Sequence, residues 1–204
     1  MFSNWDANLL GGDKVLLPNG QNIEDYVAPY DIPKKFVYYL AGYDYENRPV
    51  WVAELGKWPV KEVLEEKHVV EFDWHLKQML HRFFKSVRDR STEENGVDEI
   101  VCIIDFADQK LDQIAHIPAA RYALHFVPFA KDTLNKYVGQ VFVLNTNFAA
   151  QTFLNLLQPL FGGVFGKIAV YGNNKAQWIP KLLRTIPSKS LPEWYGGTKE
   201  YAPV

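Results

Sequence analysis

A chain of 204 residues, 48% hydrophobic and 23% charged, has the length and composition of one globular domain that can bury a sizeable core. Its formal net charge of −2 creates no overall positive field, which argues against nucleic acid as a partner. The single cysteine, Cys102, excludes an intrachain disulfide and suits a reducing compartment. The first residues lack the basic start and apolar stretch of a signal peptide, so we expect a cytoplasmic protein.

The first part of the chain predicts an arm, a hairpin and a long helix. Residues 1–33 carry several turn signals and one short helical stretch at 23–27, and they predict an N-terminal arm or reduced cap before a domain spanning 34–204. Aromatic and β-branched residues predict strands over Phe36–Tyr43 and Pro49–Glu54, joined as a hairpin. Apolar side chains then recur every three or four residues over Lys61–Arg90, which predicts one amphipathic helix.

Strands and helices alternate in the rest of the chain. The apolar run Asp98–Phe106 is typical of a strand buried on both faces, and Leu111–Tyr137 predicts two helical segments or one helix kinked by its prolines. The elements expected after it are strand Gln140–Asn145, helix Phe148–Phe161, strand Lys167–Tyr171 and helix Ala176–Arg184. This order predicts an α/β fold with a mixed, largely parallel five-stranded sheet.

No residue between Lys136 and Lys167 is charged. The stretch is interrupted by amides, prolines and glycines, and it is therefore unsuited to spanning a bilayer. Its helix, Phe148–Phe161, is apolar almost all round. Such a helix must bury more than one face, or give one face to a lipid, a membrane or a partner.

Four segments carry a recognisable pattern in chain order. They are GYDYENRPV at 42–50, Ile103-Ile104-Asp105, LQPLF at 157–161 followed by Lys167-Ile168, and LPEWYGG at 191–197. The set resembles the CRAL-TRIO family of lipid-binding domains over residues 36–197. That resemblance implies a sheet floor, helices that cover an apolar cavity, and one lipid-like molecule held inside.

The resemblance also implies a mobile gate, at about residues 148–163, which opens at a membrane. The apolar residues expected to form this membrane gate are Phe153, Leu154, Leu157, Leu160 and Phe161. The residues expected to bind the ligand are Trp51, Tyr122, Phe126, Phe142, Leu144, Phe148, Phe153, Leu157 and Lys167. For any single aromatic residue, ordinary core packing is an equally good interpretation.

Gly162, Gly163 and Gly166 follow the gate helix and are candidates for its hinge, because glycine adopts backbone angles closed to other residues. The alternative is a helix C-cap with a tight turn, which needs only one such glycine.

One departure from the family pattern concerns the lipid headgroup. Where phosphatidylinositol-binding members have Tyr-Pro-Glu, this chain has Tyr137-Val138-Gly139, so Lys167 is expected to lack its glutamate partner. We therefore expect a neutral or zwitterionic lipid in preference to phosphatidylinositol. Phospholipid, tocopherol, retinoid, carotenoid and sterol all remain open.

Signatures of catalysis are absent from the sequence. No serine lies in a G-x-S-x-G motif, and the glycine-rich stretch at 162–166 follows a helix, the reverse of a nucleotide-binding loop. His68 and His75 are too far apart along a helix to share a metal, and the aspartates at 105, 108 and 112 suit capping and turns. We expect no enzyme, no cofactor and no metal. The expected function is a carrier that exchanges one hydrophobic molecule with membranes, and the alternative is a docking module in which bound lipid is structural or regulatory.

Overall fold

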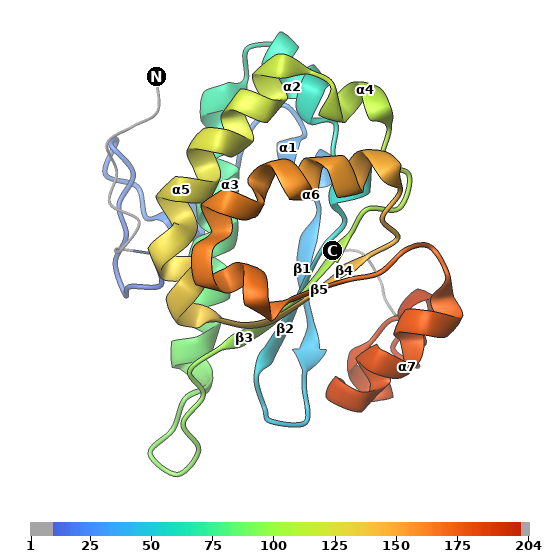
Figure 1. Ribbon diagram of the computed structural model, residues 1–204. Coiled ribbons are helices and arrows are strands. Elements are labelled where there is room, and N and C mark those ends of the chain that lie inside the picture. Colours follow the sequence, from blue (N-terminus) through green and yellow to red (C-terminus); the bar gives the residue numbers. More distant parts are fainter. Residues whose placement is uncertain (1–9, 201–204) are drawn as a thin grey trace.

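The computed structural model describes residues 10–200 and is built around one five-stranded sheet with helices on both faces (Figure 1). The strands are β1 (Tyr38–Tyr43), β2 (Pro49–Ala53), β3 (Ile100–Asp105), β4 (Val138–Leu144) and β5 (Ile168–Val170). They lie side by side in chain order. The β1–β2 pair is antiparallel and the other three pairs are parallel. The predicted mixed, largely parallel sheet is therefore confirmed.

The connection between β1 and β2 is a turn organised by Asp44. Its carboxylate accepts hydrogen bonds from the backbone N–H groups of Glu46 (3.0 Å) and Arg48 (2.7 Å), and it pairs with Arg48 Nε at 2.8 Å. Asn47 adopts a φ of +66°, which asparagine tolerates better than most residues. These contacts satisfy the polar groups of the turn and fix the hairpin that the sequence predicts.

The single long helix predicted over Lys61–Arg90 is instead two helices, α2 (Val60–Glu65) and α3 (Val69–Arg90). Lys67, between them, has a φ of +64°, which no helix can accommodate. The periodic apolar pattern continues across the break because both helices pack on the same core. Sequence periodicity alone therefore did not reveal the break.

The proline-containing region Leu111–Tyr137 forms two helices. This is the first of the two predicted alternatives, which were two helical segments or one kinked helix. They are α4 (Leu111–Ile114) and α5 (Ile117–Tyr137), with Pro118 in the first turn of α5 and Pro128 inside it. The other α-helices of the described residues are α1 (Ile32–Lys35), α6 (Phe148–Phe161) and α7 (Lys175–Thr185), and the 3-10 helix η4 (Gly162–Lys167) follows α6.

Each face of the sheet has its own apolar core. Helices α3, α5 and α6 cover one face, and α7 covers the other with the C-terminal segment (Figure 1). Successive strand residues point to opposite faces. In β4, Val141 and Val143 belong to the core under α3 and α5, while Phe142 and Leu144 belong to the core that contains Trp178 of α7.

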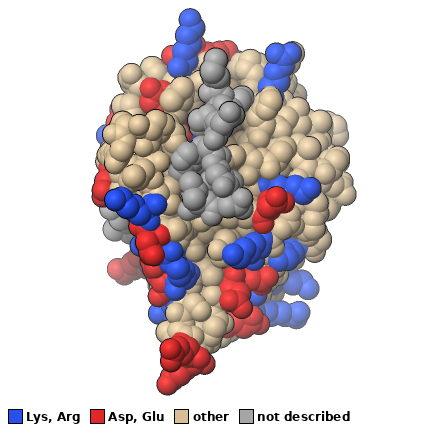
Figure 2. Space-filling view, turned by 90° about the vertical axis from the view of Figure 1, so that its left-hand side faces the viewer, with Lys and Arg blue, Asp and Glu red and all other residues tan. Residues whose placement is uncertain are grey.

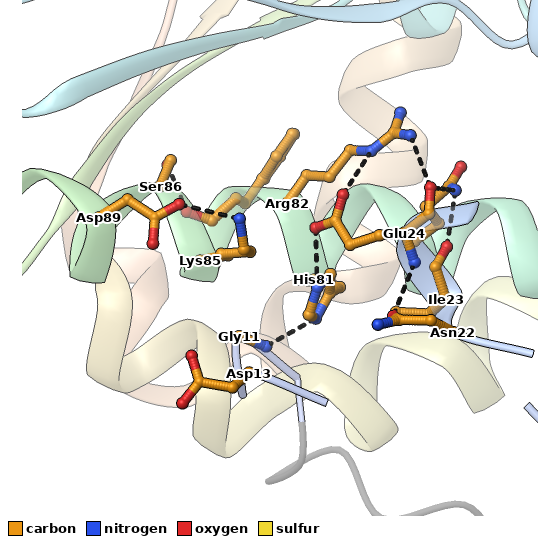
Figure 3. Close-up of polar contacts among 12 residues, drawn as sticks. Gly11, Asp13, Asn22, Ile23, Glu24, His81, Arg82, Lys85, Ser86 and Asp89 are labelled. Atoms are coloured by element: carbon orange, nitrogen blue, oxygen red, sulfur yellow. Dashed lines mark hydrogen bonds and ion pairs between the residues drawn. The ribbon is translucent and has the colours of Figure 1, made fainter. Parts of the chain in front are cut away.

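The described part of the N-terminal arm, residues 10–33, packs on the outer side of α3 (Figures 1 and 3). Figure 3 shows His81 of α3 between two points of the arm: the Gly11 N–H donates to its Nδ1 (3.1 Å), and its Nε2 lies 2.9 Å from a Glu24 carboxylate oxygen. Gln78 donates to the carbonyls of Ile23 and Tyr26, both at 2.7 Å. The arm thus covers a face of α3 that would otherwise expose buried polar groups.

Burial lowers the pKa of the His81 imidazole, and Lys85 and Arg88 act in the same direction, while Glu24 opposes them. A neutral ring with its proton on Nε2 suits the contact with Gly11, because Nδ1 then accepts from the Gly11 N–H, while Nε2 lies beside Glu24 without a hydrogen bond of regular geometry. Protonation of Nδ1 would remove the acceptor. The arm is therefore held in place by the neutral form of this histidine.

Candidate ligand cavity

An apolar cavity of ≈ 290 Å³ lies between the sheet and the helices that cover its first face. Its floor includes Cys102 of β3 with Val141 and Val143 of β4, and α3 contributes residues such as Leu76 and Met79. Burial raises the pKa of the Cys102 thiol to about 12, so this sulfur behaves as a small apolar group. A largely preformed apolar space with few polar groups is typical of a small-molecule site.

Helix α6 closes this cavity with one of its faces. Phe153, Leu154, Leu157 and Phe161 recur at helical spacing and line the cavity. The Asn147 side chain caps the helix by accepting from the Ala150 N–H at 2.9 Å. The helix therefore has a well-defined start and an inner apolar face directed at the cavity.

The outer face of α6 corrects the expectation of a helix that is apolar almost all round. Gln151, Thr152, Asn155 and Gln158 are exposed there, together with Phe148 (85% exposed) and Leu156 (50%). The outer face carries no charged side chain, but it combines polar with apolar side chains. Helical spacing places these amides and hydroxyls opposite the inner apolar residues, a separation that a count of apolar residues does not show.

The residues predicted to bind ligand or form the gate fall into separate groups. The cavity brings together Tyr122, Phe126, Phe153, Leu154, Leu157 and Phe161. Trp51 lies in the surrounding core but not on the cavity wall, and its Nε1 donates to Ser86 Oγ at 2.9 Å. Leu160 is half-buried outside the lining, and Phe148 is exposed at the start of α6.

Phe142 and Leu144 are corrected outright as cavity residues. Both are buried on the opposite face of the sheet, against α7, while their neighbours Val141 and Val143 line the cavity. Strand residues alternate between faces, and β4 is apolar at every one of these positions. The sequence pattern therefore carried no signal for which set faces the cavity.

Lys167 also lies outside the cavity lining, and the expectation that it lacks a carboxylate partner is wrong. Its Nζ lies 3.1 Å from Glu99 Oε1, and it donates to the carbonyl of Val138. Glu99 occupies the space beside Gly139, where an added Cβ would meet Glu99 Oε2 at 2.3 Å. The carboxylate thus comes from the residue before β3 instead of from β4.

Of the three glycines predicted as a hinge, Gly162 is the one with an unusual backbone. Its φ of +58° and ψ of −130° form a combination that glycine adopts readily and other residues avoid. Gly163 and Gly166 have no such φ, and a Cβ on Gly166 would meet nothing within 4 Å. Gly162 ends α6 and begins η4, so its geometry also fits the predicted alternative of a helix cap.

A buried polar group that sequence reasoning missed lies behind the cavity wall. Tyr122, which lines the cavity, donates from its hydroxyl to Asp73 Oδ1 at 2.9 Å, and Lys77 Nζ lies 2.7 Å from Asp73 Oδ2. Burial, with Asp73 second, raises the pKa of Tyr122 well above its usual range. The contacts tie α5 to α3, and neither Asp73 nor Lys77 lines the cavity. The spacing of four residues between Asp73 and Lys77 on α3 was the sequence signal that could have indicated this pair.

The remaining polar candidates have structural partners. Asp105 accepts hydrogen bonds from Ala107 N–H, Asn145 Nδ2 and Tyr195 Oη, each at 2.8 Å. His75 Nε2 lies 3.0 Å from the Phe36 carbonyl. Across residues 10–200, no group of three His, Cys, Asp or Glu residues is placed to hold a metal ion. In the same range, no helix is long and apolar enough to cross a membrane.

The fold and the cavity define a class: an α/β domain that encloses an apolar space between a mixed sheet and a covering helix. The model of the CRAL/TRIO domain matches residues 33–197, which is most of the chain. The chain therefore belongs to the CRAL/TRIO family, a family of lipid-binding and lipid-transfer domains.

Among 32 matching solved chains is the "Crystal structure of Sfh5", with a TM-score of 0.56 and 10% sequence identity. The match covers 77% of this chain and 53% of that one, so the chain spans about half the length of that structure. At such identity the likeness shows the fold alone. No curated protein matches the chain.

Proposed function

We propose that this protein is an intracellular carrier that holds one hydrophobic molecule in its cavity and exchanges it with membranes when α6 moves aside. In this proposal, residues 34–204 form the lipid-binding domain and the preceding segment is an arm. The observation that carries the proposal is the apolar cavity of ≈ 290 Å³, lined by α6, in a chain of the CRAL/TRIO family. Burial of an apolar ligand in such a space supplies the binding free energy.

The gate role of α6 is supported by the asymmetry of the helix. Its inner residues, such as Leu157, contact the cavity, while its outer face presents uncharged side chains. Figure 2 shows a broad uncharged area in the upper right of the view, the side on which α5 and α6 lie, with charged side chains gathered mostly below it. An uncharged surface of this kind can approach a bilayer without desolvating charges.

A docking module, with bound lipid in a structural role, is the second candidate. Exposed apolar side chains on three neighbouring helices favour it: Leu111 of α4, Ile117 of α5, and Phe148 and Leu156 of α6. Such a patch suits a membrane or a protein surface equally well. The two candidates differ in whether the function needs the cavity.

A cavity-filling variant separates them. Ala123 of α5 lines the cavity, and its neighbour Leu124 is exposed outside the lining. The carrier predicts that Ala123→Phe abolishes transfer of a fluorescent lipid between vesicles, while the matched control Leu124→Phe transfers normally. Circular dichroism and a thermal melt establish that both variants fold. Unchanged transfer by folded Ala123→Phe contradicts the carrier.

A further inference from the structure

The last third of the chain contains almost no acidic side chains. The first 132 residues have 22 Asp or Glu against 15 Lys or Arg, whereas residues 133–204 have two against seven. No Asp or Glu lies between Asp132 and Glu193. The positive charge of this part of the chain therefore has few carboxylates of its own to neutralise it.

Four of these cations lie on α7 and on the 3-10 helix η5 (Ser188–Ser190) that follows it. They are the exposed side chains Lys175, Lys181, Arg184 and Lys189. Lys181 and Arg184 are three residues apart, which places their Cβ atoms about 5–6 Å from each other on the helix. Lys175 begins about 9 Å along the axis from Lys181, and the chain from Arg184 to Lys189 spans at most about 18 Å. We call the region of these four cations the α7 surface.

The four cations of the α7 surface have no acidic partners within the chain. Among residues 10–200, no carboxylate oxygen lies within 4.0 Å of their side-chain nitrogen atoms. Helix α3 shows the opposite pattern, since Lys77 lies 2.7 Å from Asp73. Lys85 of the same helix lies 3.0 Å from Asp89. The α7 surface thus concentrates unpaired positive charge, while the cations of α3 are largely paired.

The carboxylates nearest to α7 do not neutralise it. The β1–β2 turn meets the end of α7, where the Tyr45 N–H donates to the Thr185 carbonyl at 3.1 Å. Both acidic residues of that turn already pair with Arg48: Asp44 at 2.8 Å and Glu46 at 3.4 Å. Glu193 is a single charge against four. The α7 surface therefore keeps a net positive charge.

The stability of the helix does not account for this arrangement. Arg184 lies in the last turn of α7, where a cation interacts favourably with the helix dipole. Lys175 is the first residue of α7, where a cation is unfavourable for the same reason. Lys181 and Arg184 repel each other at their spacing. The charges are better suited to an anionic partner than to the isolated helix.

The remaining features of α7 select the class of partner. Trp178 and Leu182 of this helix are buried, and no large apolar side chain of α7 is exposed, so the helix lacks the apolar face that interfacial helices insert into a bilayer. It also covers the face of the sheet opposite α6 (Figure 1). A nucleic acid would extend over the rest of a chain whose first 132 residues are predominantly acidic. A short acidic polypeptide complements the four cations and avoids that repulsion.

We propose that the α7 surface is a docking site for an acidic segment of another protein. The segment lies along α7, and its carboxylates pair with Lys181, Arg184 and the two flanking lysines. Because α6 and the cavity lie on the other face of the sheet, they stay free while the partner is bound. The proposal goes beyond the carrier function and does not depend on it.

A peptide of defined charge tests the chemistry of the partner. The probe is a fluorescein-labelled peptide of nine glutamates, its control is the same peptide made of glutamines, and fluorescence anisotropy measures binding to the full chain. We expect saturable binding of the glutamate peptide alone at about 0.05 M NaCl, and at least about tenfold weaker binding at about 0.5 M, because salt screens exposed charges.

Charge-reversal variants place the binding on α7. Lys181→Glu together with Arg184→Glu should weaken binding of the glutamate peptide at least about tenfold. The control is Lys14→Glu together with Lys67→Glu, which changes the net charge equally at exposed cations outside α7 and should retain the affinity within about twofold. Should the α7 double variant fail to fold, Lys181→Gln with Arg184→Gln replaces it.

Lys175→Glu separates a binding role from a structural one. An acidic residue in the first turn suits the helix dipole, so this variant should melt at the same temperature as the unmodified chain or higher. The α7 surface predicts that it nevertheless binds the glutamate peptide more weakly. Unchanged affinity in a folded Lys175→Glu overturns the assignment of this residue, and with it the surface as defined.

Each remaining outcome supports or overturns the proposal. No binding of the glutamate peptide, or equal binding by the two double variants, overturns it. If the α7 double variant keeps its affinity for the peptide but no longer co-sediments with vesicles of phosphatidylcholine and phosphatidylserine, the surface serves a membrane and the proposal fails. It also fails if the unmodified chain self-associates at low salt and the α7 double variant does not, because the occupant is then a second copy. Lipid transfer unaffected in the α7 double variant supports a partner site separate from the carrier function.

Discussion

Replacing the two exposed apolar residues of α6 should weaken membrane association without destabilising the fold. The perturbation is Phe148→Ala together with Leu156→Ala. Phe148 is 85% exposed and Leu156 is 50% exposed, so neither contributes much to the core. Exposed substitutions of this kind usually change stability by less than about 0.5 kcal/mol.

The expected loss of membrane affinity follows from the exposed area. Complete burial of a Phe or Leu side chain is worth about 1.5–3 kcal/mol, so the exposed parts of both residues together are worth roughly 2–4 kcal/mol in a bilayer. This corresponds to a partition coefficient roughly 30- to 1,000-fold lower, an upper bound because alanine keeps a methyl group. Vesicle co-sedimentation measures the partition, and transfer of a fluorescent lipid measures the consequence.

Leu157→Ala provides the matched contrast on the inner face of the same helix. Leu157 is 3% exposed and lines the cavity, so its truncation should cost about 2–5 kcal/mol of stability and leave vesicle association nearly unchanged. The reasoning is refuted if the folded double variant, Phe148→Ala with Leu156→Ala, co-sediments with vesicles to the same extent as the unmodified protein. In that case the exposed residues of α6 do not meet the membrane.

Three further predictions address the glycines after α6, the contact of the N-terminal arm with His81, and the buried hydrogen bonds of Asp105. In chemical denaturation, Gly162→Ala should lower the free energy of unfolding by about 1–3 kcal/mol because of the backbone angles at this position, and Gly166→Ala should leave it unchanged. If Gly162 is a hinge, folded Gly162→Ala should exchange lipid more slowly than the unmodified protein. Unchanged exchange favours a plain helix cap. Because burial lowers the pKa of His81, the unfolded chain binds more protons below about pH 6.5, so stability should fall as the pH drops from there by up to about 1.4 kcal/mol per unit. In His81→Gln the slope of stability against pH should flatten, and an unchanged slope would exclude this histidine as its source. Asp105→Ala should lower the free energy of unfolding by about 3 kcal/mol or more, because three donors lose their acceptor. Ligand affinity should be retained below the melting temperature of the variant. A loss of affinity without a loss of stability would assign Asp105 to the ligand site.

The sheet and most elements could be predicted from the sequence because their signals are local. The β1–β2 hairpin, the buried strand β3 and helix α6 each follow from periodicity and turn residues within a short window. The break at Lys67 could not be predicted, because a positive φ at a lysine leaves no compositional mark and the apolar period continues beyond it.

The cavity wall was harder to predict than the fold. The inner residues of α6 follow from helical spacing, but the two faces of β4 cannot be distinguished where four successive residues, Val141–Leu144, are all apolar. Gln109 and Gln113 lie on the wall only because the loop after β3 and the short helix α4 fold over its end. The pairing of Glu99 with Lys167 joins the residue before β3 to the residue before β5, which no spacing in the chain indicates.

Native mass spectrometry of the gently purified protein tests the central claim most directly. A carrier with this apolar cavity should retain one extractable hydrophobic molecule per chain, and Ala123→Phe should lose it while Leu124→Phe keeps it. The spectrum should then show the mass of the chain plus one hydrophobic small molecule. A stably folded protein that carries no ligand, and takes up none from vesicles, would contradict the account.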